Sequence, residues 1–341
     1  MMPATEPRSI RESARLLVVD SSRSTFRDAR MTDLPELLQP GDLLVLNDAA
    51  TVPASIRAWT TAGEPIEIRL MRQAQHSDWL AVLLGDGDWR TATELRDPPV
   101  KVSVGDRLQI SADFDAEVVR ISDKSDRLVT LRFNRSAPEM WTGIYAYGRP
   151  IQYSYLKNDL QLWSVQTVYA SRPWAMEMPS AGRPLAWSIL LELKRRGISL
   201  AWLTHAAGLS AVGHEELDDC LPMAEYFEIP QATADAIEKA RRDDRRVIAV
   251  GTTVVRALEG CAAAMDGRIL AGRGETDLVI DRSFRPAVVR GILTGVHDPS
   301  QSHFRLLHAF SDETTLRRAW RHATEAGYLC HEFGDSCLLL R

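Results

Sequence analysis

The chain contains no long apolar run and no leader-like N-terminus. None of its 341 residues belongs to a run of about 18 consecutive apolar residues, the minimum expected for a membrane-spanning helix. Residues 1–15 lack the apolar segment and the small-residue cleavage site of a signal peptide. We therefore expect a cytoplasmic protein with no membrane contact.

The chain is also poor in cysteine. Its four cysteines are scattered, without the short paired spacing of a zinc site or a dithiol motif. They are expected to be reduced and structural, and neither a metal nor a redox cofactor is predicted. The cysteines are Cys220, Cys261, Cys330 and Cys337.

No strong excess of either charge is present. The formal net charge is −5 and the sequence pI is about 5.9. A general electrostatic attraction to nucleic acid is thereby excluded, so any contact with RNA requires a local basic patch. Basic residues cluster at 194–196, 241–246 and 317–321, although such clusters are usually solvated helix faces.

The composition, with 45% hydrophobic and 26% charged residues, is that of a globular protein with room for two domains. From about residue 56 to 133, apolar and polar residues alternate with a period of two, which predicts β-structure. We expect an inserted β-barrel domain over residues 57–149. Residues 1–56 and 150–341 are expected to form the domain that carries it.

Helical and strand patterns alternate in the second half of the chain. This alternation predicts the α/β class, with a largely parallel sheet. Buried strands are also predicted at 16–20 and 42–47. The predicted helix and strand pairs are 185–196 with 199–203, 232–242 with 247–250, and the helix after 253 with 277–280.

The most informative segment is RVIAVGTTVVRALEG, at residues 246–260. Residues 247–250 form a short apolar run, typical of a strand buried on both faces. Apolar residues then recur at intervals of four, as in a helix. Gly251 lies between the two patterns, so the segment predicts a strand, a tight turn and a helix.

The start of this helix has the features of an anion site. Thr252 and Thr253 would present hydroxyls, free backbone N–H groups and the positive end of the helix dipole at the carboxyl edge of a sheet. Arg256 opposes that dipole, so we expect it to face a ligand carboxylate, a phosphate or a buried acid. A capped core helix with a surface arginine is the alternative interpretation.

Several short motifs occur together in a fixed order. With them, the chain resembles the S-adenosylmethionine:tRNA ribosyltransferase-isomerase family of queuosine biosynthesis from about residue 16 to 340. The resemblance implies a barrel-like α/β domain with an inserted all-β barrel. The motifs are LLQPGDLLVLND at 37–48, QTVYA at 166–170, PSAG at 179–182, VIAVGTTVVRALE at 247–259, GET at 274–276, HDP at 297–299 and FGD at 333–335.

The resemblance also implies a reaction. In this family the ribosyl part of S-adenosylmethionine is transferred to 7-aminomethyl-7-deazaguanine in tRNA and isomerised, which gives epoxyqueuosine, while adenine and methionine leave. Such a reaction needs a base for a proton next to the sulfonium and a donor that assists the departure of adenine. S-adenosylmethionine is then a co-substrate, and no cofactor is required.

The candidate site residues follow predicted strands or turns. Asn47 and Asp48 end an apolar strand, and we expect them to orient the nucleoside, with an Asx turn as the alternative. His297 lies in a loop and is expected to transfer a proton with a pKa near neutrality. His205 follows another strand and is expected to line the same edge.

Further candidates lie in turns and on surface segments. Ser180 and Gly182 belong to a turn suited to close approach of a ligand. Glu225 and Glu228 are candidates for binding a ribose hydroxyl or an amine, unless they are merely solvated. In the resulting hypothesis, a carboxylate or phosphate of the ligand is held at the helix start, with Arg256 as counter-ion.

The sequence departs from the family pattern at several of these loops. The family element T-A-G-L-H-F reads Ser-Ala-Gly-Arg-Pro-Leu at 180–185, so a histidine and a phenylalanine are absent while Arg183 adds a charge. N-D-T-R reads Asn-Asp-Ala-Ala at 47–50, which removes a cation. Two alternatives to the tRNA enzyme follow: an enzyme that uses S-adenosylmethionine on a small-molecule acceptor, and a noncatalytic binding protein.

Overall fold

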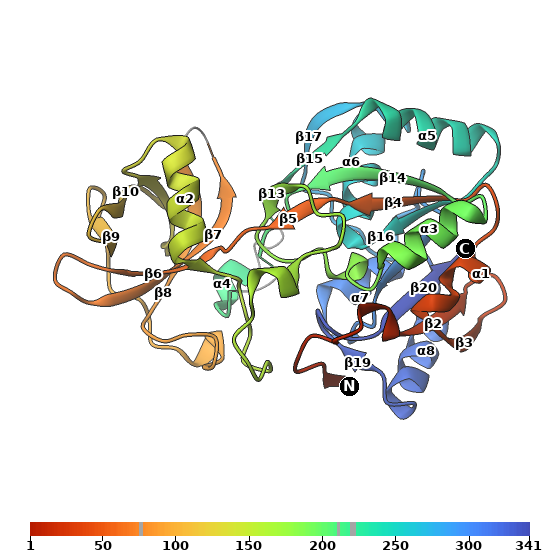
Figure 1. Cartoon of the computed structure of the whole chain (residues 1–341), viewed down its shortest axis with the longest axis horizontal. Helices are drawn as coiled ribbons and strands as arrows, with labels where there is room; N and C mark the ends of the chain where they lie inside the picture. The colour runs from red at the N-terminus through yellow and green to blue at the C-terminus, as the bar shows by residue number, and fades with distance from the viewer. Residues whose placement is uncertain (75–77, 210–211, 219–222) are drawn as a thin grey trace.

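A computed structural model describes residues 1–74, 78–209, 212–218 and 223–341. Figure 1 shows a smaller β-rich part beside a larger part in which helices surround a sheet, and both chain termini lie in the larger part. The described cysteines, Cys261, Cys330 and Cys337, are free and buried, as predicted. Cys220 lies outside the described residues.

The smaller part is built on a closed ring of β-strands. The order along the ring is β6-β7-β8-β11-β10-β9, and pairing of Trp59 with Gln109 joins β9 back to β6. Apolar residues at alternate positions point inward and form one core. The predicted β-barrel is therefore confirmed. Its strands are β6 (Ser55–Trp59), β7 (Pro65–Gln73), β8 (Asp78–Leu84), β9 (Arg107–Ser111), β10 (Phe114–Ser122) and β11 (Ser125–Phe133).

One helix packs against the core of the barrel. Helix α2 (Ala137–Tyr147) begins at a capping box formed by Ser136 and Glu139. It buries Met140 and Ile144 in the barrel core. The short strand β12 (Gly148–Arg149) then pairs with β6 and leads the chain back to the larger part. The domain boundaries at residues 56/57 and 149/150 stay a prediction.

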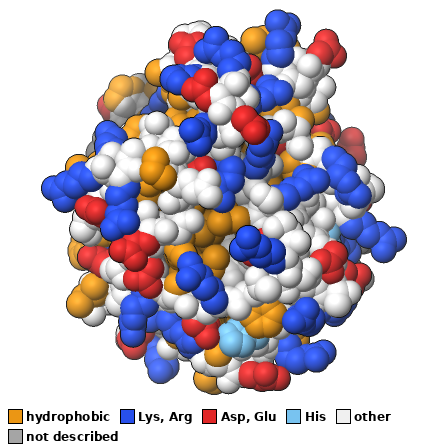
Figure 2. All heavy atoms as spheres, turned by 90° about the vertical axis from the view of Figure 1, so that its right-hand side faces the viewer, with side chains coloured by type: hydrophobic (Ala, Val, Ile, Leu, Met, Phe, Trp, Pro, Cys, Tyr) orange, Lys and Arg blue, Asp and Glu red, His pale blue; other side chains and the backbone are white. Residues whose placement is uncertain are grey.

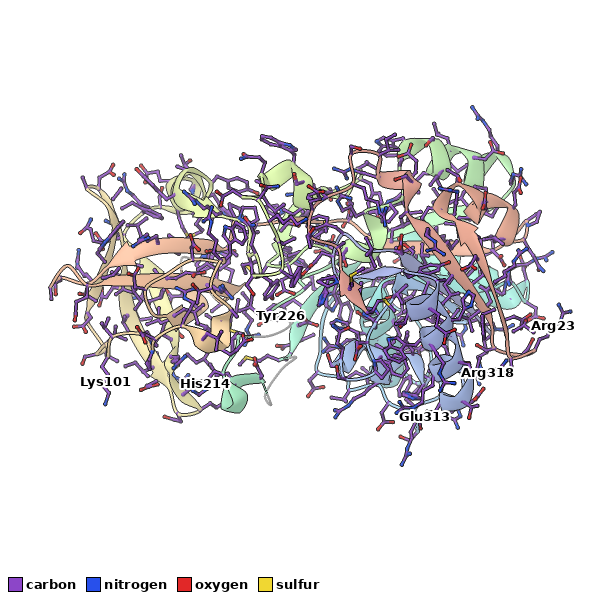
Figure 3. All side chains as sticks on the ribbon, turned by 90° about the horizontal axis from the view of Figure 1, so that it is seen from below. Arg23, Lys101, His214, Tyr226, Glu313 and Arg318 are labelled. Carbon is purple, nitrogen blue, oxygen red and sulfur yellow. The ribbon has the colours of Figure 1, made fainter. Side chains whose placement is uncertain are left out.

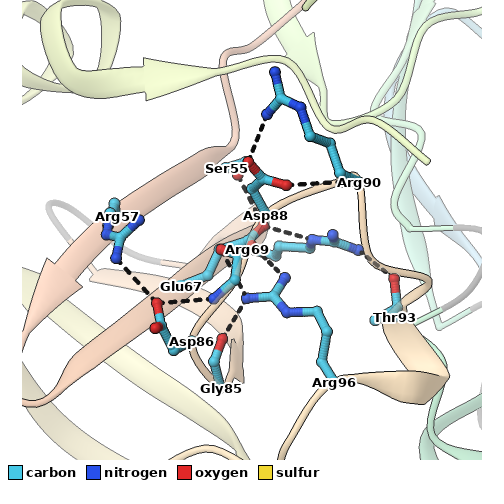
Figure 4. Close-up of polar contacts among 11 residues, drawn as sticks. Ser55, Arg57, Glu67, Arg69, Gly85, Asp86, Asp88, Arg90, Thr93 and Arg96 are labelled. Atoms are coloured by element: carbon cyan, nitrogen blue, oxygen red, sulfur yellow. Dashed lines mark hydrogen bonds and ion pairs between the residues drawn. The ribbon is translucent and has the colours of Figure 1, made fainter. Parts of the chain in front are cut away.

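A buried ion triad reinforces the barrel. Glu67 on β7 accepts hydrogen bonds from Arg69 (2.8 Å), Ser55 (2.8 Å) and Arg96. Arg96 also donates to the Gly85 carbonyl oxygen, and Figure 4 shows how these side chains converge. Burial alone would raise the pKa of Glu67, but the two guanidinium groups outweigh it and the pKa is lowered.

The larger part contains a nine-stranded sheet. Parallel pairing joins β14, β4, β16 and β18 at its centre. In order across the sheet, the strands are β17 (Gly272–Thr276), β15 (Glu225–Ile229), β14 (Ser199–His205), β4 (Leu43–Asn47), β16 (Val247–Val250), β18 (Gly291–Gly295), β20 (Ser336–Leu340), β2 (Arg15–Asp20) and β3 (Thr25–Arg30).

The predicted α/β class is confirmed, but two details of the sheet were wrong. The sheet is mixed rather than largely parallel, because β15, β17, β20 and β3 each pair antiparallel with a neighbour. The predicted strand at 277–280 is irregular, and the strand at this place is β17. The other predicted strands of this part, at 16–20, 42–47, 199–203 and 247–250, are present within about one or two residues.

Helices cover both faces of this sheet. Leu43 and Val45 of β4 pack in one core with α5 (Gln231–Arg242), α6 (Thr252–Ala264), α7 (Ser302–Leu307) and α8 (Glu313–Glu325). Leu44 and Leu46 pack on the other face with α1 (Leu34–Leu37) and α3 (Trp187–Arg195). Because successive side chains of a strand alternate between faces, a strand buried on both faces needs a continuous apolar run such as LLVL.

The remaining elements are short. Strand β1 (Met2–Pro3) pairs with β19 (Leu329–Cys330), and β5 (Ala49–Thr51) pairs with β13 (Arg172–Ala175). Helix α4 (Glu215–Asp218) lies near the barrel (Figure 1). Across the four described stretches of the chain, no helix is both long and apolar enough to cross a bilayer.

Candidate functional site

The predicted strand, turn and helix at residues 247–264 are present as β16, Gly251 and α6. Gly251 has a φ of 91° and a ψ of 158°, a backbone region open almost only to glycine. It offers no side-chain cap to α6, and Thr252 and Thr253 are partly exposed. The first turn of α6 therefore presents uncapped amides at the carboxyl edge of the sheet.

Gly251→Ala is expected to lower the free energy of unfolding by about 1–3 kcal/mol, since alanine is strained in this backbone conformation. The added Cβ would lie 3.4 Å from the Cβ of Ala181, an ordinary contact, so backbone strain rather than a clash causes most of the loss. Urea unfolding of the wild type and of Gly251→Ala measures this loss of stability. Gly208→Ala is the control, because Gly208 does not have a positive φ and its nearest neighbour would be 3.5 Å away; equal destabilisation of the two variants would contradict this explanation.

Asn47, at the end of β4, is hydrogen-bonded within the protein, and its predicted role in orienting the nucleoside stays a prediction. Its Oδ1 accepts from the backbone N–H groups of His205 (2.9 Å) and Ala49 (3.1 Å). Its Nδ2 donates to the His205 carbonyl oxygen (3.1 Å) and to Thr253 Oγ1 (3.4 Å). An asparagine amide has two donors and two acceptor lone pairs, and all are used. Asn47 therefore joins β4 to β14 and to α6 and positions the edge of the site.

Asp48 has a different environment. It is partly exposed, and its carboxylate accepts from the hydroxyls of Thr204 (2.6 Å) and Ser171 (2.8 Å). Two hydroxyl donors fix the orientation of the carboxylate without neutralising it. Asp48 thus remains a candidate for contact with a ligand.

Beside Asn47 lies a cluster formed by His205, Glu225 and Arg256. Glu225 Oε2 pairs with Arg256 Nη1 and lies 3.4 Å from His205 Nε2. Its Oε1 accepts from the Gly208 N–H at 2.8 Å. The His205 side chain is fully buried, and those of Glu225 and Arg256 are each 10% exposed. Burial, followed by the charge of Arg256, lowers the pKa of His205, although Glu225 acts in the opposite direction.

Of the partners predicted for Arg256, the structure supports the buried acid. Glu225 compensates its charge, so Arg256 is not a free counter-ion for a ligand anion as hypothesised. Arg256 Nη2 and both ring nitrogens of His205 have no hydrogen-bond partner among the described residues. Buried polar atoms of this kind are costly when they are unpaired.

His297 follows β18, two strands from Asn47 in the sheet order. Its Nε2 hydrogen-bonds Thr294 Oγ1 at 2.8 Å, and its ring stacks on His303 with centroids 5.1 Å apart. Burial, followed by the proximity of His303 and His331, lowers the pKa of His297 well below its ordinary value. The expected pKa near neutrality was wrong, because burial favours the neutral form of the ring.

The buried histidines predict acid sensitivity. Burial lowers the pKa of His205, His297 and His303, whereas the unfolded chain has a histidine pKa of about 6.5. The unfolded state therefore binds more protons below this pH, and stability present above it is lost as the pH falls. We expect the urea midpoint of the wild type to decrease from pH 7.5 to pH 5.5. The decrease is expected to be smaller in His205→Gln than in the wild type. A midpoint that rises as the pH is lowered would contradict the prediction.

The predicted turn at Ser180 and Gly182 forms a 3-10 turn beside β18. A Cβ on Gly182 would meet the Tyr169 hydroxyl at 1.9 Å, so only glycine fits there. Ser180 and Ala181 line a pocket together with Gly295 at the end of β18. The turn thus connects this pocket to Gly251, which it approaches through Ala181.

Three arginines line the same pocket: Arg8, Arg11 and Arg183. The departure from the family pattern had indicated Arg183 as an added charge. The sequence analysis did not identify Arg8 and Arg11 as site residues, because no pattern in the sequence indicates that the N-terminal segment lies beside the FGD segment of residues 333–335. Arg8 reaches Asp335 at 2.6 Å, and this long-range ion pair brings the N-terminus to the site.

Glu228, another candidate for a ligand contact, is paired with two arginines. It forms ion pairs with Arg172 (2.7 Å) and Arg273 (2.9 Å). Hydrogen bonds from Arg172 and then Arg273 lower the pKa of Glu228 to about 2. Its neighbour Tyr226 lies where the sheet meets the barrel (Figure 3), and Glu225 reaches a second pocket there, lined also by Met71 and Met223.

The basic clusters at 194–196, 241–246 and 317–321 are partly paired with acidic residues. Acidic neighbours pair with several members, as for Arg196 with Glu192 and Arg317 with Glu313. Figure 2 shows basic side chains spread over one end of the molecule with acidic ones between them. Over the described ranges, no group of three or more His, Cys, Asp or Glu residues is placed to hold a metal ion.

Comparison with known proteins places the chain in one family. A family model described as queuosine biosynthesis protein matches residues 1–339. An S-adenosylmethionine:tRNA ribosyltransferase-isomerase of Methylocella silvestris is 33% identical over 351 residues, covering 98% of this chain and 93% of that protein. The Thermus thermophilus protein of the same name is 34% identical over 344 residues, covering 97% and 93%.

A solved structure shares the fold. The crystal structure of S-adenosylmethionine tRNA ribosyltransferase from Thermotoga maritima has a TM-score of 0.54 and 24% identity, and the match covers 99% of this chain and 96% of that chain. The predicted family is thus confirmed by sequence, and the fold by structure. The chain belongs to the queuosine biosynthesis protein family.

Proposed function

We propose that this protein transfers the ribosyl moiety of S-adenosylmethionine to 7-aminomethyl-7-deazaguanine in tRNA and isomerises it, giving epoxyqueuosine. The observation that carries the proposal is the relation over almost the full length to proteins named for this activity. The uncapped helix start and the unpaired donors at the same sheet edge give it further support.

The proposed reaction uses groups at the carboxyl edge of the sheet. His297 is the proposed acceptor of the proton next to the sulfonium, which the adjacent positive charge acidifies; in the free protein burial makes this ring a weak base. Asp48, held by two hydroxyls, is placed to orient a ribose hydroxyl. Thr252 and Thr253 offer amides and hydroxyls to the ligand, and S-adenosylmethionine is a co-substrate, so the reaction requires no cofactor.

An activity measurement tests the proposal. Purified protein is incubated with S-adenosylmethionine and tRNA that carries 7-aminomethyl-7-deazaguanine, and the digested nucleosides are identified by mass spectrometry. We expect epoxyqueuosine in the tRNA, with release of adenine and methionine in equal amounts. Binding of S-adenosylmethionine without adenine release would contradict the proposed reaction.

A second candidate is transfer to a small-molecule acceptor. It is favoured by one observation: the basic clusters that a bound tRNA would use are in part neutralised by acidic neighbours. Electrophoretic binding to the modified tRNA at low salt separates the candidates. Detectable binding that weakens with salt supports the tRNA enzyme, whereas adenine release with a free 7-deazapurine and no tRNA binding supports the alternative.

A further inference from the structure

The pocket beside the 3-10 turn at Ser180 carries more positive than negative charge. Arg8 is paired with Asp335. Arg11 donates to the carbonyl oxygens of Gln166 and Trp163. Arg183 Nε donates to the Ser164 carbonyl oxygen at 3.0 Å. Within the described part of the chain, neither Arg11 nor Arg183 pairs with a carboxylate, so two guanidinium charges lack a counter-ion.

The acidic groups of the pocket are bonded to partners other than Arg11 and Arg183. Asp335 already accepts from Arg8 and from the backbone N–H groups of Arg15 and Leu329, at 2.9 Å each. Glu332 accepts a hydrogen bond from the Tyr155 hydroxyl, and its burial raises the carboxyl pKa, which favours the neutral form. The charges of Arg11 and Arg183 are therefore not balanced by an acid that lines the pocket.

Arg183 is held rigidly in this environment. It is 5% exposed, and its guanidinium lies 4.9 Å from the centre of the Phe333 ring. Burial, followed by the charges of Arg11 and Arg8, lowers the pKa of Arg183 to about 10, so it is charged at neutral pH. A buried, charged guanidinium without an acid is costly unless a ligand compensates it.

We infer that Arg183 and Arg11 receive the carboxylate of the amino-acid portion of S-adenosylmethionine, an assignment that rests on the proposed function. A guanidinium presents paired donors that match a carboxylate. Because Arg183 is almost fully buried, a terminal carboxylate on a flexible chain reaches it more readily than a phosphate in the backbone of a folded RNA.

The position of the pocket fits the rest of such a ligand. On one side, Ala181 approaches Gly251 at the start of α6. On the other side, Gly295 adjoins His297, whose Cε1 is 3.7 Å from the Cβ position of that glycine. A ligand whose carboxylate occupies the arginine pocket extends from there to the carboxyl edge of β16 and β18, where the proposed base lies.

A double comparison tests the assignment. Dissociation constants are measured by calorimetry for S-adenosylmethionine and for its decarboxylated analogue, with wild-type protein and with Arg183→Met. We expect the wild type to prefer the carboxylated ligand by about tenfold or more, as for loss of one charge-assisted contact. In Arg183→Met this preference falls to about threefold or less, because the analogue is affected much less than the full ligand.

Two further variants separate a local effect from unfolding. Arg183→Lys keeps a cation and is expected to keep part of the preference. Arg23→Met is the matched control, because the Arg23 side chain is 80% exposed and does not line the pocket; it lies at one end of the molecule (Figure 3). Both variants, and Arg183→Met, are compared with the wild type by circular dichroism and thermal unfolding.

The other outcomes overturn the inference in distinguishable ways. Equal wild-type affinity for the two ligands refutes the carboxylate pocket and leaves the proposed function intact. Undetectable binding of both ligands refutes the proposed function together with the inference. An unchanged preference in Arg183→Met, accompanied by weaker binding of tRNA, assigns the pocket to a phosphate.

Discussion

Arg256→Met is expected to lower the free energy of unfolding by about 3–5 kcal/mol, the range observed when one partner of a buried ion pair is removed. The substitution leaves Glu225 with the Gly208 amide and a neutral His205 as its remaining neighbours. A carboxylate so deeply buried is poorly solvated, and no other cation pairs with it among the described residues. We also expect strongly reduced binding of S-adenosylmethionine at the adjoining sheet edge.

The effect of Arg256→Met has a defined pH dependence. Removal of the arginine takes away one cause of the lowered His205 pKa and leaves the opposing effect of Glu225. The folded-state pKa of His205 therefore rises in the variant, and protonation restores a cation beside Glu225. Stability relative to wild type is then recovered as the pH falls, so the deficit is larger at pH 8 than at pH 6.

Two controls accompany the Arg256→Met measurement. Arg273→Met removes a 78% exposed arginine from its ion pair with Glu228 and is expected to cost less than about 1 kcal/mol. In the double variant Glu225→Gln, Arg256→Met, part of the lost stability returns, because no charge remains unpaired. A deficit no larger than that of Arg273→Met would mean that the buried pair does not hold the cluster together.

Glu67→Ala is expected to destabilise the barrel by a similar amount, about 3–5 kcal/mol. Arg69 and Arg96 are 2% exposed in their side chains, and both depend on Glu67 for a negative charge. Their hydrogen bonds to Thr93 and to the carbonyl oxygens of Gly85 and Gly87 remain, but their charges are left without a counter-ion. Because the folded pKa of Glu67 is lowered, its contribution is present at neutral pH and is lost on acidification.

The matched control for Glu67→Ala is a neighbouring ion pair of the barrel. Arg57 and Asp86 form an ion pair at 3.0 Å, but their side chains are 57% and 60% exposed. Figure 4 shows this pair beside the triad. Asp86→Ala is expected to change the free energy of unfolding by less than about 1 kcal/mol. Equal effects of Glu67→Ala and Asp86→Ala in urea unfolding would contradict the role assigned to the triad.

The strands that the sequence predicted correctly are those with a clear burial pattern. LLVL in β4 and VIAV in β16 are buried on both faces, so composition alone defines them. The strand predicted at 277–280 was wrong, because these residues lack such a burial pattern. Its apolar residues suggested burial, yet Val279 is 74% exposed. The true strand, β17, reads GRGET and exists because it pairs with β15 at the edge of the sheet, a tertiary interaction that local pattern does not reveal.

The site was predicted in outline but not in its roles. The end of β4, the start of α6 and the loop after β18 were expected at one edge, and the sheet order places them there. The function of each side chain depends on distant partners. Asn47 forms two of its hydrogen bonds with His205, 158 residues away, and the acid that pairs with Arg256 is 31 residues from it. Spacing in the sequence carries no information about such pairings.

The most direct measurement is a crystal structure of the protein with S-adenosylmethionine bound. We predict the carboxylate within hydrogen-bonding distance of Arg183, and the ribose between the start of α6 and His297. A ligand bound instead in the pocket formed by Met71, Met223 and Tyr226, with the edge of β16 and β18 filled by side chains, would contradict the proposed site.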